Sequence, residues 1–196
     1  SFAGKVGELY APSRDQEKAK EYLATALSEL GCTVDDLSAH LSIDCGDSPT
    51  SIAEASFYQE QWRQVLGIEV AVNSMITKQG SQNRKTGNYV MSITGWGPDY
   101  NDPMTDLDLM MSTNGNNHTG YADADYDALI ESTKTERDAA AREQIFVQAE
   151  MKLAEDMPVI PVYWRHEDYA ASEKLVEGYA RKPFQAYNFI YTKLAD

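Results

Sequence analysis

The chain has 196 residues, of which 42% are hydrophobic and 24% charged, and its formal net charge is −14 at pH 7. This length suits one globular domain, or one lobe of a larger protein. The negative charge, with no basic stripe between aromatic residues, argues against a nucleic-acid partner, and no apolar run is long enough to predict a membrane-spanning helix.

The first third of the sequence alternates between helical and extended patterns. Residues 13–30 carry apolar side chains at helical spacing and are followed by Gly31, a residue typical of a helix end. Residues 39–46 alternate between apolar and polar side chains and predict a half-buried strand. A second helix is predicted at residues 49–66 and a second strand at residues 68–75. This order is typical of an α/β layer with at least two neighbouring parallel strands.

The middle of the sequence leads into its most distinctive motif. Residues 78–88 are predicted to be a polar connector, and residues 89–96 a strand that runs into GWGPDYNDP. A short apolar helix and a loop are predicted within residues 106–123.

The last third is predicted to be helical and then extended. Helices are expected at residues 122–136 and 137–157. Residues 158–172 are apolar and β-branched and predict a buried strand, whose start is made irregular by two prolines. An aromatic strand is predicted at residues 183–196.

No metal, cofactor or nucleophile signature stands out. Asp123, Asp125 and Asp127 resemble the start of a calcium-binding loop, but Ala128 replaces the required glycine and Lys134 the required glutamate. The sequence has no Gly-rich phosphate loop and no nucleophile elbow. We therefore expect no metal, no cofactor and no catalytic residue.

The two cysteines, Cys32 and Cys45, fit no zinc pattern. Two interpretations stay open from the residues alone. They are either separate small core residues or one disulfide that closes a short loop in an oxidising compartment.

Two aspartates in the motif invite an enzymatic hypothesis. Asp99 and Asp102 lie close in sequence, and carboxylate pairs perform acid–base catalysis in glycosidases. Aspartates in turns rich in Pro and Asn are more often structural, because their side chains bond their own backbone. We expect no catalysis from this pair.

The neighbouring tryptophan offers a binding hypothesis. Gly95 and Gly97 remove side chains on both sides of Trp96, which lets another backbone approach the strand closely. A peptide pairing with this strand would place its ammonium near a carboxylate just beyond it. The alternative interpretation is a core tryptophan at a strand end.

Several segments, in order, resemble one known family. These are GWGPDYNDP at residues 95–103, the helix at residues 15–31, the helix-to-strand unit at residues 51–72, and residues 121–164. Together they resemble the solute-binding proteins of peptide ABC transporters, family 5 of the bacterial extracellular solute-binding proteins. The resemblance covers nearly the whole chain.

The resemblance implies a fold and a role. It implies an α/β fold, with residues 1–196 forming the C-terminal lobe of a type II periplasmic-binding-protein-like fold, a mixed sheet flanked by helices. The N-terminal lobe would belong to an absent part of the same chain. The parent would lie outside the cytoplasm, in the periplasm or lipid-anchored at the cell surface. It would deliver oligopeptides or dipeptides to the permease and ATPase subunits of an importer, without being an enzyme.

The resemblance also implies roles for individual residues. Asp99 would bind the α-amino group of the peptide, the backbone from Thr94 through Gly95 to Gly97 would pair with it, and Trp96 would wall a side-chain pocket. Ile93 stands where some peptide binders carry a basic residue. Relatives of this fold bind oligosaccharides, metal chelates or haem, so these ligands, and more remotely a carboxylate-pair hydrolase, remain alternatives. The implied extracytoplasmic setting favours a Cys32–Cys45 disulfide.

Overall fold

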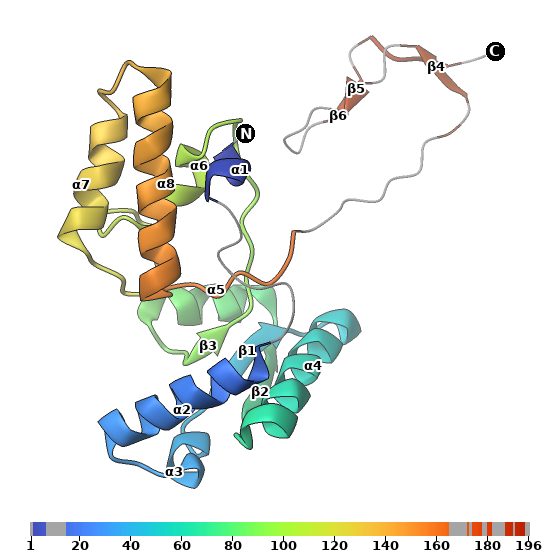
Figure 1. Cartoon of the computed structure of the whole chain (residues 1–196). Helices are drawn as coiled ribbons and strands as arrows, with labels where there is room; N and C mark the ends of the chain where they lie inside the picture. Colours follow the sequence, from blue (N-terminus) through green and yellow to red (C-terminus); the bar gives the residue numbers. More distant parts are fainter. Residues whose placement is uncertain are drawn as a thin grey trace. The chain divides into compact units, whose positions relative to one another are not determined.

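The computed structural model describes residues 2–6, 15–164, 172, 174–177, 180–181, 187–189 and 191–194 (Figure 1). The chain divides into two compact units. The first contains residues 3–95 and 118–120, and the second contains residues 96–117 and 121–196. No helix within the described ranges is both long enough and apolar enough to cross a membrane.

The first unit is built on a small parallel sheet. Its central strand, β1 (Ser42–Gly46), pairs with β2 (Ala71–Met75) on one side and with β3 (Met91–Ser92) on the other. The predicted parallel neighbours are confirmed. This sheet is parallel throughout. The antiparallel pairs that the structure describes belong to two separate two-stranded sheets. The strand predicted at residues 89–96 is wrong in length, because regular pairing ends at Ser92.

Helices pack around this sheet. They are α2 (Gln16–Leu30), α3 (Val34–Ser38), α4 (Pro49–Leu66) and α5 (Thr77–Thr86). Helix α4 packs against β1 and β2, and α2 lies beside α4 (Figure 1). Gly31 and Gly67 end α2 and α4 in the left-handed conformation that glycine adopts at low cost. The two predicted helices are therefore confirmed together with their C-terminal ends.

The core of the first unit contains one of the two cysteines. Its buried side chains come from the strands, α4 and the loop after α4: Ile43, Cys45, Ala55, Ile68 and Val70. Both cysteines are free thiols in the structure, and Cys32 is only partly buried, just after α2. The expected disulfide is not formed in this structure, and the Cys45 thiol is packed in the core. The same burial raises the pKa of the Cys45 thiol.

Helix α5 corrects the sequence prediction of a polar connector. It has no apolar stripe and no side-chain cap, since Ile76 occupies the N-cap position. It buries Gly80 and Asn83 instead, and it ends at Gly87 in the left-handed conformation. Hydrophobic periodicity missed it because the helix packs on the sheet through a polar side chain.

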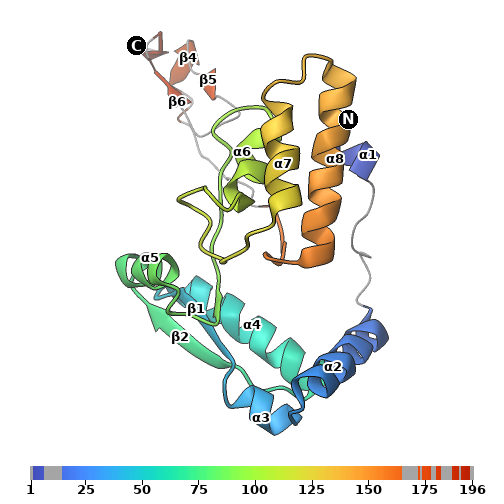
Figure 2. The same ribbon diagram turned by 90° about the vertical axis from the view of Figure 1, so that its left-hand side faces the viewer.

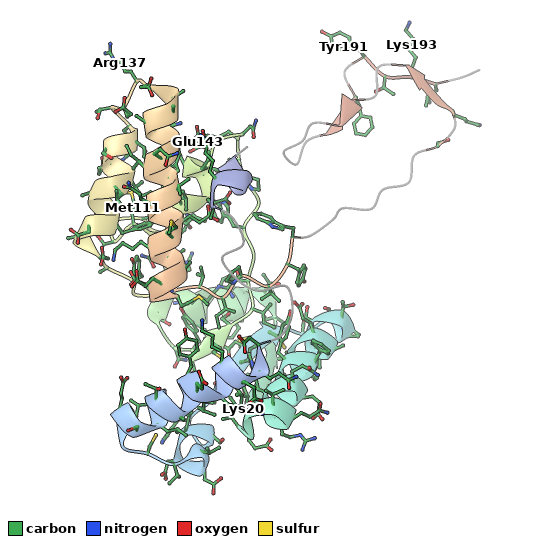
Figure 3. All side chains as sticks on the ribbon, in the orientation of Figure 1. Lys20, Met111, Arg137, Glu143, Tyr191 and Lys193 are labelled. Atoms are coloured by element: carbon green, nitrogen blue, oxygen red, sulfur yellow. The ribbon has the colours of Figure 1, made fainter. Side chains whose placement is uncertain are left out.

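The part of the second unit that precedes residue 157 is helical. It contains α6 (Met104–Leu107), a 3₁₀ turn η1 (Asp108–Met110), α7 (Ala124–Thr133) and α8 (Ala139–Asp156). Figure 2 shows α7 and α8 side by side, and α6 also packs against α8. Their shared core consists of Met104, Leu107, Met111, Tyr126, Ile130, Phe146 and Ala149. Met111 is labelled in Figure 3. The helices predicted from sequence in this region are confirmed.

The segment after α8 differs from its prediction. Residues 158–164 form no strand, and most of their side chains are exposed, with Trp164 84% exposed. Pro158 and Pro161 lack the backbone N–H that a buried strand donates to its neighbours. The remainder of that predicted strand lies outside the described residues, except for Ser172.

The C-terminal part contains two short antiparallel pairs. Strand β4 (Leu175–Glu177) pairs with β7 (Lys193–Leu194), and β5 (Ala180–Arg181) pairs with β6 (Tyr187–Asn188). The aromatic strand predicted at residues 183–196 is thus found as β6 and β7, with residues 183–186, 190 and 195–196 outside the described ranges.

Candidate ligand-binding site

The candidate site begins where β3 leaves the parallel sheet. The carboxyl ends of parallel strands lie at one edge of a sheet, and ligands of open α/β folds bind outside that edge. Backbone pairing continues one residue beyond β3, because the N–H of Ile93 donates to the carbonyl of Asp44 at 2.9 Å. The next residues, Thr94 and Gly95, are exposed. A Cβ atom added at Gly95 would meet no atom within 4 Å, so its backbone is open to an approaching chain.

The boundary between the two units falls between Gly95 and Trp96, within the predicted site. In the second unit the Trp96 side chain is 47% exposed. Within the described part of the chain, its indole has no hydrogen bond and no ring partner. A core tryptophan, the alternative interpretation, is therefore wrong. Half of the indole surface is available to cover a ligand.

Asp99 has a fixed backbone and an available carboxylate. Its N–H donates to the hydroxyl Oγ1 of Thr105 at 3.0 Å, and Thr105 is only 4% exposed. The side chain of Asp99 is exposed, and among the described residues it forms no hydrogen bond and no ion pair. A carboxylate in this state is ready to accept a cation or a hydrogen-bond donor from a ligand.

Asp102 has the opposite environment. Its carboxylate forms a bidentate ion pair with Arg142, with Nη1–Oδ2 at 2.6 Å and Nη2–Oδ1 at 3.0 Å. Oδ1 also accepts the backbone N–H of Met104 at 3.0 Å. The hydrogen bonds from Arg142 hold the pKa of the Asp102 carboxyl below its usual value.

These environments bear on the carboxylate-pair hypothesis. A glycosidase-type pair needs one carboxyl that is protonated near neutral pH and acts as the acid. Asp102 is kept ionised by Arg142 and occupied by its structural partners. The geometry suits binding of a charged group by Asp99 better than acid–base chemistry by the pair.

Two of the three aspartates that resembled a calcium loop, Asp123 and Asp127, form structural contacts. Asp123 caps α7 by accepting the N–H of Tyr126 at 2.7 Å, and it pairs with Lys152 at 3.0 Å. Asp127 accepts hydrogen bonds from the backbone and hydroxyl of Ser112.

Sequence analysis missed Thr105 and Arg142. Thr105 lies six residues after Asp99, and Arg142 lies forty residues after Asp102. No residue spacing or motif indicates either contact. The Thr105 contact is local to the start of α6, whereas the Arg142 contact joins the turn to α8.

Comparisons with known proteins agree with this fold. The family model of bacterial extracellular solute-binding proteins, family 5 Middle, matches residues 2–118. The oligopeptide-binding protein OppA of Bacillus subtilis (strain 168) is 34% identical over 176 residues, which are 86% of this chain and 31% of that protein. The chain spans about a third of the length of the curated relatives it matches.

Solved structures show the same similarity. The structure of a peptide-binding protein of a peptide ABC transporter matches with a TM-score of 0.72 and 28% identity, over 82% of this chain and 69% of that one. The substrate-binding domain of an oligopeptide ABC transporter from Bacillus anthracis str. Ames matches with a TM-score of 0.83 and 24% identity. That match covers all of this chain and 37% of the other, and it shows the shared fold.

Proposed function

The chain belongs to family 5 of the bacterial extracellular solute-binding proteins, and on this premise we propose that it is part of the peptide-capturing component of an ABC importer. It binds oligopeptides or dipeptides outside the cytoplasm and delivers them to a membrane permease that is driven by ATPase subunits. The proposal is supported by relatives whose names describe oligopeptide- and dipeptide-binding proteins.

One observation carries the choice of a peptide ligand. The carboxylate of Asp99 is exposed and without a partner in the described residues, and it lies three residues after the exposed Trp96 and four after the open backbone of Gly95. Asp99 accepts the α-ammonium of the peptide, and the backbone of Thr94–Gly97 pairs with the first peptide bonds. Trp96 covers a side chain of the peptide.

The two compact units of the chain both belong to the C-terminal lobe of a two-lobed binding protein. The N-terminal lobe, supplied by the rest of the longer chain, encloses the ligand from the other side. Hinge closure between the lobes excludes water from the Asp99–ammonium pair and thereby strengthens it. No bond of the ligand is made or broken, so the protein acts as a carrier and not as an enzyme. The complete protein is either attached to the membrane by a lipid anchor or located in the periplasm, where it can meet its permease.

Isothermal titration calorimetry on the complete protein tests the ligand class. One series titrates a pool of unmodified di- to pentapeptides, and a parallel series titrates oligosaccharides of similar size. Saturable heat with peptides only is the expected result. Saturable heat with the sugars only would contradict the proposal and would reassign Trp96 to sugar stacking.

A further inference from the structure

The turn that carries Asp99 is attached to α8 through a chain of three contacts within the second unit. The N–H of Asp99 bonds the hydroxyl of Thr105, which lies in α6. The side chain of Asp102 accepts the N–H of Met104, the first residue of α6, and forms an ion pair with Arg142 of α8. Thr105 is 4% exposed and Met104 is 9% exposed, whereas Asp102 and Arg142 are both partly buried. The backbone of the turn is therefore linked to a helix far away in sequence.

The first contacts fix the turn itself. The hydroxyl of buried Thr105 accepts the N–H of Asp99, and the N–H of Thr105 donates to the carbonyl of Asp102 at 3.1 Å. Asp102 also receives the N–H of Met104 on its side chain. The backbone between Asp99 and Thr105 is therefore tied at both ends to the start of α6.

Arg142 is itself held in one orientation. Its Nε donates to the carbonyl of Thr133 at the end of α7 at 3.0 Å. The guanidinium carbon lies 4.6 Å from the centroid of the Phe146 ring, which is 1% exposed in the core. The planar guanidinium is held by α7 and by Phe146. Its Nη1 and Nη2 groups therefore face Asp102, and little side-chain entropy is lost when they bond.

We propose that Arg142 is a positioning residue for ligand recognition, and this inference rests on the proposed function. Its bidentate pair with Asp102 sets the turn so that the Asp99 carboxylate meets the α-ammonium of the peptide. A lysine at position 142 supplies the charge but not the planar fork, so it cannot hold both oxygens of Asp102. When the bidentate contact with Asp102 is lost, the Asp99 carboxylate is still there, but it no longer lies where the ammonium of the peptide binds.

The test measures discrimination between ligands, which a general loss of stability does not change. For each variant of the complete protein, calorimetry gives the ratio of the Kd for an N-acetylated peptide to the Kd for the same peptide with a free amine. Arg142→Gln and Arg142→Lys are each expected to lower this ratio by about tenfold, because one charge-assisted hydrogen bond is weakened. A variant that only loses folded protein lowers the number of binding sites for both peptides alike and leaves the ratio unchanged.

Two further variants separate the possible outcomes. Arg137→Gln is the matched control, because Arg137 is an exposed arginine in the turn before α8 and points away from the helices (Figure 3); it is expected to keep the ratio of the unmodified protein. Asp102→Asn removes the ion pair while keeping the side-chain volume, and it is expected to reproduce Arg142→Gln, so it serves if that variant does not fold.

The failure of this inference is distinguishable from the failure of the proposed function. If Asp99→Asn abolishes discrimination while Arg142→Gln and Asp102→Asn retain it, the positioning role of Arg142 is wrong and the recognition role of Asp99 stands. If Asp99→Asn itself retains discrimination, the proposed role of Asp99 is wrong. In the Asp99→Asn background, adding Arg142→Gln is expected to change the ratio no further.

Discussion

The buried carboxylate of Asp44 in β1 accepts a hydrogen bond from the side-chain amide of Asn83 in α5, with Nδ2–Oδ2 at 3.1 Å. Its other oxygen accepts from the amide of Asn73 in β2 at 3.2 Å. Asp44 is 5% exposed, so these two amides replace the water that the carboxylate loses on folding. The hydrogen bond between Asp44 and Asn83 explains how α5, a helix without an apolar stripe, is attached to the sheet.

Removing this amide is expected to destabilise the fold. Asn83→Ala leaves one oxygen of a buried carboxylate unsatisfied and is expected to lower the free energy of unfolding by about 1–3 kcal/mol. Urea denaturation followed by circular dichroism measures the change. Gln82→Ala, at an exposed neighbouring position of the same helix, is the control and is expected to change stability by less than about 0.5 kcal/mol. Equal stability of the two variants would show that Asp44 does not depend on Asn83.

A half-buried carboxylate on α8 gives a pH-dependent prediction. Burial raises the pKa of Glu150 above its ordinary value of 4.5, and the charge of Asp106 adds to this effect. The raised pKa means that the folded state binds the proton more tightly than the unfolded state. The charged form of Glu150 therefore destabilises the fold at neutral pH, and this cost disappears as the pH falls through the folded pKa toward 4.5.

Glu150→Gln is accordingly expected to be more stable than the unmodified protein at pH 7 and to lose this advantage as the pH approaches 4.5. Urea midpoints measured across this pH range check the prediction. Glu155→Gln, at an exposed position of the same helix, is expected to show no such pH-dependent gain. A constant advantage of Glu150→Gln at all pH values would contradict the assigned cause.

An N-cap prediction concerns the stability of α8. The Oδ1 atom of Asp138 accepts the N–H of Ala141 at 2.8 Å and caps the helix. Asp138→Ala is expected to cost about 1 kcal/mol of unfolding free energy, whereas Asp138→Ser retains a capping oxygen and costs less. Thermal unfolding of the two variants distinguishes them, and equal losses would rule out capping as the cause.

Ligand binding is expected to change the environment of Trp96. Its half-exposed indole becomes covered when a peptide side chain packs against it, so the tryptophan emission of the complete protein shifts to shorter wavelength on peptide addition. Trp96→Phe is expected to reduce this shift. Trp62→Phe is the control, because Trp62 packs against the core of the first unit beside Tyr58. A shift that survives Trp96→Phe and vanishes with Trp62→Phe would place the ligand elsewhere.

The parts of the fold that sequence predicted are those with local signals. Apolar side chains at helical spacing and the glycine after Leu30 located α2 correctly, and α4 was found at its predicted residues 49–66. Helix α5 has no such signal, because its buried contact is the amide of Asn83 with a carboxylate far away in sequence. The apolar run at residues 158–164 gave a misleading signal, since composition indicates a buried strand only where a pairing partner exists.

In the candidate site, too, the sequence indicates some residues, while others are identified only by tertiary packing. The motif drew attention to Asp99 and Trp96, but Asp99 and Asp102 are alike in sequence, both aspartates of one turn. Only tertiary packing separates them, because Arg142 occupies Asp102 and leaves Asp99 available. Arg142 acts from a helix forty residues after Asp102, and no spacing along the chain predicts its contact.

In the proposed function, the Asp99 carboxylate receives the α-ammonium of a peptide. The most direct measurement is calorimetric titration of the complete protein and its Asp99→Asn variant with short peptides and their N-acetylated counterparts. Asp125→Asn, a change of the same kind at an exposed aspartate of α7, is the control. We expect acetylation and Asp99→Asn each to weaken binding by about tenfold or more, with little further loss when they are combined, because both remove the same charge-assisted bond. Binding that is indifferent to both changes would contradict the claim.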